Sequence, residues 1–261
     1  MRISLGVFLL AVSLALFGGP IAVGAPADDV WMTFDSGSLA TGRSPGSVTN
    51  LGSADVTARV VTLDGGEATR VTGHGPGEAL RFPAFSGSSN PPRAVLRITN
   101  DGSPDQLNPG TARFSFGADL RLRKESEGTR ADNGNNVLQR GLYEDAAQYK
   151  LDVDGRRPGC RVKGASGTVS VRSAARVNPR DWYRVACTRD ESAVTMRVVQ
   201  FLEGGGRRTS TKSASGPTGV VVMSSPRTPM SVAGKLQTDG RLVPSTDQFN
   251  GVIDRVFLRI G

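Results

Sequence analysis

The sequence predicts an all-β protein, an antiparallel sandwich or barrel, and three observations support this fold class. Apolar and polar residues alternate with a period of two along the chain, while helical periodicity is almost absent. Turn-forming Gly, Pro, Asn and Asp residues separate the short apolar runs. Hydrophobic residues make up 38% of the chain, which is enough for a packed core. Parallel α/β folds are disfavoured because no helical segments lie between the apolar runs.

Residues 1–27 are predicted to be a signal peptide. Arg2 precedes an apolar run over residues 5–17, and Ala25 and Ala27 supply the small residues of a cleavage site. The apolar run is shorter than the ~20 residues that a membrane span requires, which disfavours a retained anchor. We therefore expect a secreted protein that has no membrane span after cleavage. Its mature chain, residues 28–261, is expected to form one domain.

In the first half of the chain, residues 113–123 give the clearest strand. Phe114, Phe116 and Leu120 alternate there with Ser115 and Asp119, which predicts a strand with one buried face. The other strands expected in this half cover residues 29–35, 56–63, 79–82 and 94–99. Turn signals separate them at residues 64–66, 90–92 and 100–102.

The second half of the chain repeats the alternation. The strands expected here cover residues 136–141, 148–153, 160–163, 168–172, 183–188, 194–201, 219–223, 231–235 and 251–260. Turn signals lie at residues 154–155, 204–206 and 239–240. Within 194–201 the alternation slips from Val198 to Val199 and Phe201, which predicts a bulge.

The two cysteines, Cys160 and Cys187, are predicted to form a disulfide. Export would place them in an oxidising compartment, and two cysteines allow only one connectivity. The bridge closes a loop of 28 residues counted inclusively. Such a loop is expected to stabilise the fold by roughly 3 to 4 kcal/mol. A redox pair is disfavoured because the spacing is not Cys-x-x-Cys.

Catalytic chemistry is disfavoured, and no catalytic residue is predicted. The single histidine, His74, excludes zinc sites with two or three imidazoles and lies in a Gly- and Pro-rich stretch, residues 73–77. The carboxylate pairs of sandwich glucanases lie on one face of one strand, whereas Glu144 and Asp145 are adjacent and would point to opposite faces.

The net charge of +8 comes mainly from arginine. The 27 arginines and 5 lysines are scattered over most expected strands and form no basic tract. This distribution favours solvated strand faces, and a surface for nucleic acid or for anionic glycans is the alternative.

Several stretches of the sequence, taken in order, resemble a known family. They are residues 31–35, 136–141, 148–151, 160–164, 182–189, 216–219, 231–235 and 247–256. In this order they resemble bacterial secreted laminin-G-like, or concanavalin A-like lectin/glucanase, jelly-roll domains. The resemblance implies a two-sheet antiparallel β-sandwich whose first and last strands pair, with a disulfide between two strands. It leaves the function open, because this fold hosts lectins, glycosidases, lyases and adhesion modules.

A structural calcium ion is expected at Asp254 with Asp35, because the fold often carries such a cation and calcium prefers oxygen ligands. Asp254 follows the alternation of Val252 and Val256, and a carboxylate among apolar neighbours must be paired or metal-bound. A salt bridge to an arginine such as Arg255, or a hydrogen bond to Trp31, is the alternative.

Ligand binding is expected at Asp132, Asn133, Asn135 and Tyr143. The first three belong to a stretch rich in oxygen donors, for which an ordinary hairpin turn is the alternative. Tyr143 is the best candidate for an exposed aromatic side chain, because it lies in a polar loop.

These observations favour a secreted, non-catalytic recognition module for a carbohydrate or cell-surface component. One alternative is a glucanase-like or polysaccharide-lyase-like enzyme of the same fold. Another is a structural or adhesion protein that binds anionic wall polymers through its basic surface.

Overall fold

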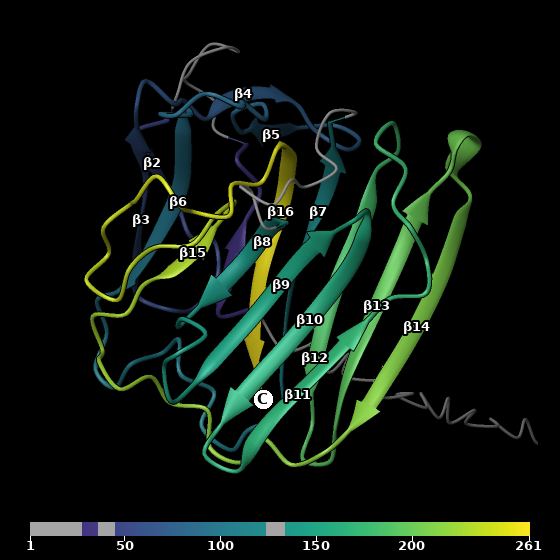
Figure 1. Ribbon diagram of the computed structural model, residues 1–261. Helices are drawn as coiled ribbons and strands as arrows, with labels where there is room; N and C mark the ends of the chain where they lie inside the picture. Colours follow the sequence, from purple (N-terminus) through teal and green to yellow (C-terminus); the bar gives the residue numbers. More distant parts are fainter. Residues whose placement is uncertain (1–27, 36–44, 124–133) are drawn as a thin grey trace, which may run out of the picture.

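The computed structural model describes residues 28–35, 45–123 and 134–261. It confirms the predicted fold class, because all paired strands are antiparallel and form two sheets of eight strands. Figure 1 shows the two sheets stacked face to face. The strands are β1 (Val30–Met32), β2 (Ser47–Val48), β3 (Val56–Leu63), β4 (Thr69–Thr72), β5 (Glu78–Arg81), β6 (Arg93–Asn100), β7 (Phe114–Leu122), β8 (Asn135–Arg140), β9 (Gln148–Asp154), β10 (Arg157–Gly164), β11 (Gly167–Arg172), β12 (Tyr183–Arg189), β13 (Ala193–Phe201), β14 (Arg207–Ser215), β15 (Met230–Val232) and β16 (Gly251–Ile260).

One sheet, here the terminal sheet, has the order β14-β13-β12-β7-β16-β5-β4, and β1 also pairs with β16. The first and last strands therefore pair as the resemblance implies, with Val30 opposite Leu258. The other sheet, here the opposite sheet, has the order β11-β10-β9-β8-β15-β6-β3-β2. Among the described residues, helix is limited to the 3-10 turn Glu203–Gly205, and no helix is long and apolar enough to cross a membrane.

The hairpin of β9 and β10 shows how local sequence sets the register. Gly155 and Arg156 connect the strands, and both have positive φ, 53° and 66°. Two such residues match the twist of antiparallel strands, and glycine adopts this conformation without strain. The pairing then runs from Asp154 opposite Arg157 to Gln148 opposite Lys163.

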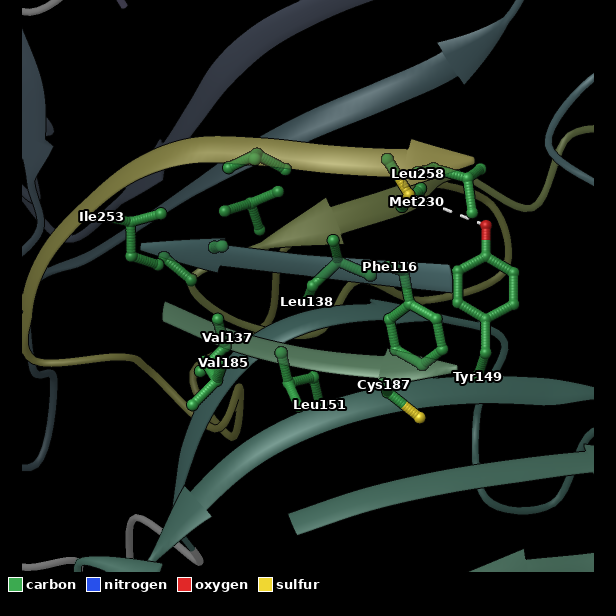
Figure 2. Close-up of a cluster of buried hydrophobic side chains, with 14 of the residues drawn as sticks. Phe116, Val137, Leu138, Tyr149, Leu151, Val185, Cys187, Met230, Ile253 and Leu258 are labelled. Carbon is green, nitrogen blue, oxygen red and sulfur yellow. Dashed lines mark hydrogen bonds between the residues drawn. The ribbon is translucent and has the colours of Figure 1, made fainter. Parts of the chain in front are cut away.

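The core lies between the sheets and is formed by alternate residues of most strands (Figure 2). Phe116 and Val185 of the terminal sheet are buried, as are Leu138 and Leu151 of the opposite sheet. Tyr149 is also buried, and its hydroxyl donates to the carbonyl oxygen of Leu107 at 3.2 Å. The alternation expected for half-buried strands is therefore present in both layers.

The predicted disulfide between Cys160 and Cys187 is confirmed. Cys160 belongs to β10 and Cys187 to β12, so the bridge joins the two sheets across the core. The two Cα atoms are 6.1 Å apart, which is within the usual range for a disulfide. Both residues are buried, so solvent has little access to the bridge.

Two strand predictions in the second half of the chain were wrong. The segment 219–223 is not a strand, because Val221 makes only an isolated bridge with Gly110. The bulge expected in 194–201 is absent, since β13 pairs with β12 and β14 without a register shift. Val198 and Val199 are both buried, so the consecutive apolar residues reflect burial on both faces of β13.

A bulge occurs instead in β16, where the register with β7 shifts between Asp254 and Phe257. Arg255 has a φ of 48° at this point. The bulge places Asp254 opposite Asp119 on the outer face, while Val256 packs in the core. The expectation that Asp254 and Val256 share a face was therefore wrong.

Candidate functional site

The outer face of β8 to β11, nearest the viewer in Figure 1, is hollowed into a groove of about 640 Å³. Its floor is the opposite sheet, and loops after β8 and after β15 form its walls. The lining residues are Gln139, Leu142, Tyr143, Glu144, Gln148, Lys150, Asp152, Gly159, Cys160, Arg161, Ser170, Val171, Arg172, Lys235, Gln237, Ser245 and Asp247.

Strand alternation supplies the polar floor of the groove. Tyr149 and Leu151 of β9 enter the core, so Lys150 and Asp152 between them point outward into the groove. Gly159 of β10 lies opposite Asp152, and a Cβ atom at Gly159 would be only 2.6 Å from Asp152 Oδ1. The missing side chain therefore leaves room on the floor for the Asp152 carboxylate.

An alternating chain of charges crosses this floor. Asp247 lies between Lys235 and Lys150, with N···O distances of 3.3 and 3.8 Å. Asp152 lies between Lys150 and Arg172, at 3.4 and 3.5 Å. Burial raises the pKa of Asp152, while Lys150 and Arg172 act in the opposite direction. Both floor carboxylates are thus held by cations of the protein.

Tyr143 stands at one wall of the groove and is 64% exposed. The Arg161 guanidinium carbon lies 4.1 Å from the centre of its ring, in a cation–π contact. The Lys163 ammonium donates to the carbonyl oxygen of Tyr143 at 3.1 Å. Two cations of β10 therefore hold an exposed aromatic ring beside the polar floor.

Two glutamines complete the floor with both donors and acceptors. The side-chain amides of Gln139 and Gln148 donate to the carbonyl oxygen of Gly141, at 2.7 and 3.1 Å. Gln148 is only 2% exposed, yet its Oε1 has no hydrogen-bond partner among the described residues. Arg161 Nε is likewise buried without a partner in this part of the chain. A buried polar atom without a partner is costly, so the groove floor holds two unsatisfied polar atoms next to its lining.

The structure places the expected ligand-binding residues in different surroundings. Tyr143 lines the groove. Asn135 is buried away from the groove, and its Oδ1 accepts a hydrogen bond from the backbone N–H of Asn250 at 2.8 Å. Asp132 and Asn133 lie outside the described residues.

Asp254, an expected calcium ligand, lies on β16 of the terminal sheet, and Asp35, the other one, follows β1, which pairs with β16; neither lines the groove. Asp35 Oδ1 accepts from the backbone N–H of Glu78 at 2.5 Å. Asp254 Oδ1 accepts from the N–H of Arg255 at 2.7 Å, and the Arg255 guanidinium is 4.0 Å from Oδ2. Within the described ranges, no three His, Cys, Asp or Glu side chains are grouped as metal ligands. The calcium site stays a prediction.

Asp254 is expected to make the protein more stable as the pH falls from 7 towards 4. Burial, with smaller contributions from Asp119 and Asp35, raises its pKa from 3.8 to about 6. The folded state therefore takes up this proton before the unfolded state does, and the stabilisation is complete below pH 3.8 and lost as the pH rises through about 6. The contribution is at most about 3 kcal/mol, at 1.36 kcal/mol per pKa unit.

Urea unfolding of the wild type and of Asp254→Asn between pH 4 and 7.5, with a chelator present, tests this expectation. The two pH profiles should differ most near pH 7, where the variant is more stable because it carries no buried charge. Parallel profiles would contradict the raised pKa. Repeating the series with calcium tests the predicted ion site, because a bound cation would keep the carboxylate ionised and stabilise only the wild type.

Comparisons with known proteins show similarity in fold alone. No family model and no curated protein matches the sequence. Among solved structures, the binding domain of Paraclostridial Mosquitocidal Protein 1 is similar with a TM-score of 0.52 and 12% identity, over 88% of this chain and 49% of that chain. The binding domain of botulinum neurotoxin DC, in complex with rat synaptotagmin II, has a TM-score of 0.53 and 11% identity, over 89% of this chain and 48% of that chain. The binding domain of botulinum neurotoxin serotype G has a TM-score of 0.53 and 11% identity, over 90% of this chain and 48% of that chain.

This chain spans about half the length of those solved structures. At such low identity the likeness supports the β-sandwich architecture and assigns no ligand. The groove must therefore be interpreted from its own residues.

Most of the groove residues were not singled out from the sequence. The sequence predicts strands over 148–153 and 160–163, which contain Lys150, Asp152 and Arg161, but it does not predict that these side chains line a groove. Charged residues at alternate positions of β9 and β10 indicate the outer face of a sheet, but this pattern does not predict a groove on that face.

Proposed function

We propose that this protein is an exported, non-catalytic recognition module that binds a carbohydrate in the groove on the opposite sheet. The observation that carries the proposal is the combination of an exposed aromatic ring, Tyr143, with buried and half-buried polar side chains on one hollowed face. Sugars present hydroxyl groups around faces of C–H bonds, so they suit a site that offers hydrogen bonds beside an aromatic surface.

The floor supplies both kinds of hydrogen-bonding group. The carboxylates of Asp152 and Asp247 accept, whereas the terminal N–H groups of Arg161 and the ammonium groups of Lys150 and Lys235 donate. Asp152 and Arg161 come from paired strands, and Asp247 is held by ion pairs with Lys235 and Lys150, which reduces the ordering cost of binding. The groove volume of about 640 Å³ lies within the range typical of small-ligand sites.

The charges in the groove support binding more than catalysis. A glycosidase needs one carboxylic acid and one carboxylate across the sugar. Asp152 and Asp247 are instead each contacted by two cations of the protein. His74 packs over the terminal sheet, with its ring centre 4.0 Å from that of Phe201. The alternative of a glucanase-like or lyase-like enzyme therefore has less support from these residues.

Tyr143→Ala is expected to weaken carbohydrate binding by about tenfold, because stacking against an aromatic ring contributes on the order of 1 kcal/mol and the ring also positions Arg161. An array of neutral and acidic glycans identifies ligands of the wild type, and titration calorimetry then compares the variants. Leu51→Ala is the matched control, because Leu51 is another large exposed apolar side chain, 62% exposed, and does not line the groove.

Unchanged affinity in Tyr143→Ala, or an equal loss in both variants, would contradict this use of the groove. Binding of no glycan on the array would contradict the proposed function itself.

The proposal also includes the family resemblance, the export and the calcium ion that the sequence predicts. We place the chain with laminin-G-like and concanavalin A-like jelly rolls, in agreement with the two antiparallel sheets and the pairing of β1 with β16. Export through residues 1–27 and a structural calcium ion at Asp35 and Asp254 belong to the same proposal. The disulfide that joins the two sheets supports export, because disulfides are stable in an oxidising compartment.

A further inference from the structure

We infer that the groove selects acidic carbohydrates, and that Arg161 is the residue that pairs with a carboxylate or sulfate group of the ligand. This inference rests on the proposed function and goes further by naming the chemical class of the ligand. It follows from the charges of the floor, from the contacts of Arg161 and from the geometry of β9 and β10.

The floor carries more positive than negative charge. The alternating chain described above begins at Lys235 and ends at Arg172, so its three cations enclose two carboxylates. Arg161 adds a fourth cation to the lining, and the remaining acid, Glu144, is exposed at the rim. The two floor carboxylates are engaged by Lys235, Lys150 and Arg172, so they do not neutralise Arg161.

Arg161 has no acidic partner in the described part of the chain. No carboxylate oxygen of the described residues lies within 4.0 Å of its guanidinium nitrogens, and its buried Nε donates to none of them. Its cross-strand neighbours are Lys150 on β9 and Ser170 on β11. Like charges directly opposite each other on a sheet are destabilising, so the pairing of Arg161 with Lys150 gains from a bound anion.

The orientation of Arg161 favours an anion that can accept two hydrogen bonds side by side. Tyr143 covers one face of the guanidinium, with the ring centre 4.1 Å from Cζ. Arg161 Nε is buried, so the N–H groups open to a ligand are those of the terminal Nη1 and Nη2 atoms, whose edge stacking on an aromatic ring leaves available. A guanidinium edge matches a carboxylate or sulfate through two parallel hydrogen bonds. The sugar ring that carries such a group would then lie on the floor beside Gln148.

The test uses pairs of polysaccharides in which the anionic group of one member is esterified or removed in the other. Galacturonan and alginate are compared with their methyl-esterified forms, and chondroitin sulfate with its desulfated form. Calorimetry with the purified protein should give about tenfold tighter binding of at least one acidic polymer than of its neutralised partner, since a charge-assisted pair is lost in the latter.

Three variants assign the selectivity. Arg161→Gln should bring the affinity ratio of acidic to neutralised polymer close to one, with little change for the neutralised polymer. Arg161→Lys, which keeps the charge and loses the planar edge, should retain only part of the ratio. Arg59→Gln is the matched control, because Arg59 is an exposed cation on β3 of the same sheet that does not line the groove.

The outcomes separate this inference from the proposed function. Equal affinity for acidic and neutralised polymers would overturn the acidic selectivity and leave carbohydrate binding in place. An equal loss of selectivity in Arg161→Gln and Arg59→Gln would assign it to overall charge and overturn the role of Arg161. If no carbohydrate binds, the proposed function fails and the inference fails with it. Melting temperatures of the variants within a few degrees of the wild type would show that the fold is intact.

Discussion

Arg140→Met is expected to lower the free energy of unfolding by about 3 to 5 kcal/mol, the cost typical of removing one partner of a buried ion pair. The Arg140 side chain is fully buried. Its Nη2 lies 2.6 Å from Asp105 Oδ2, its Nη1 donates to Asn108 Oδ1 at 3.0 Å, and its Nε donates to the carbonyl oxygen of Thr228 at 3.0 Å. One guanidinium thus connects β8 to two separate loops.

The loss arises because the variant leaves the Asp105 carboxylate, only 9% exposed, without its cation. Arg241→Met is the control. Arg241 forms an ion pair with Asp239, and their side chains are 75% and 62% exposed, respectively. Such an exposed pair should contribute less than about 1 kcal/mol to the free energy of unfolding. Urea unfolding curves measure both variants. A change below about 1 kcal/mol in Arg140→Met would contradict the importance of this buried network.

Replacing both cysteines by alanine is expected to lower the free energy of unfolding by about 3 to 4 kcal/mol. The bridge between Cys160 and Cys187 spans 27 positions of sequence, and its loss lets the unfolded chain occupy more conformations. The double variant avoids a free thiol and leaves two small buried gaps. Thermal and urea unfolding under identical conditions give the difference.

The disulfide also supports the groove, because Cys160 lines it and precedes Arg161 in β10. The double cysteine variant should therefore bind ligand more weakly than the wild type at a temperature where both are folded. Unfolding curves that coincide with those of the oxidised wild type would contradict a stabilising role for the bridge.

Strands with one buried face could be predicted closely from the sequence. The expected bounds of 56–63 and 251–260 agree with β3 and β16, because alternation and flanking turns mark both strands. By contrast, β14 was missed because the residues of Arg207–Ser215 are almost all polar and mostly exposed. An edge strand of this kind forms by pairing with β13, and local sequence contains no hydrophobic signal for it.

The site could be predicted only in part, because it joins distant segments. Tyr143 could be recognised as an exposed aromatic residue within one loop. Lys235 and Asp247, however, meet Lys150 only after the chain has passed through the other sheet and returned. Such an ion-pair chain depends on tertiary packing, and the spacing of these residues in the sequence does not indicate it.

The claim that carbohydrate binds in the groove is tested most directly by titrating the ¹⁵N-labelled protein with the best ligand from the array and following backbone and side-chain amide signals. We expect the largest shift changes at Gln148, Tyr143 and Arg161, including the Gln148 side-chain amide and the Arg161 Nε–H. Changes centred on the terminal sheet near His74 and Trp182, with the groove signals unmoved, would contradict the account.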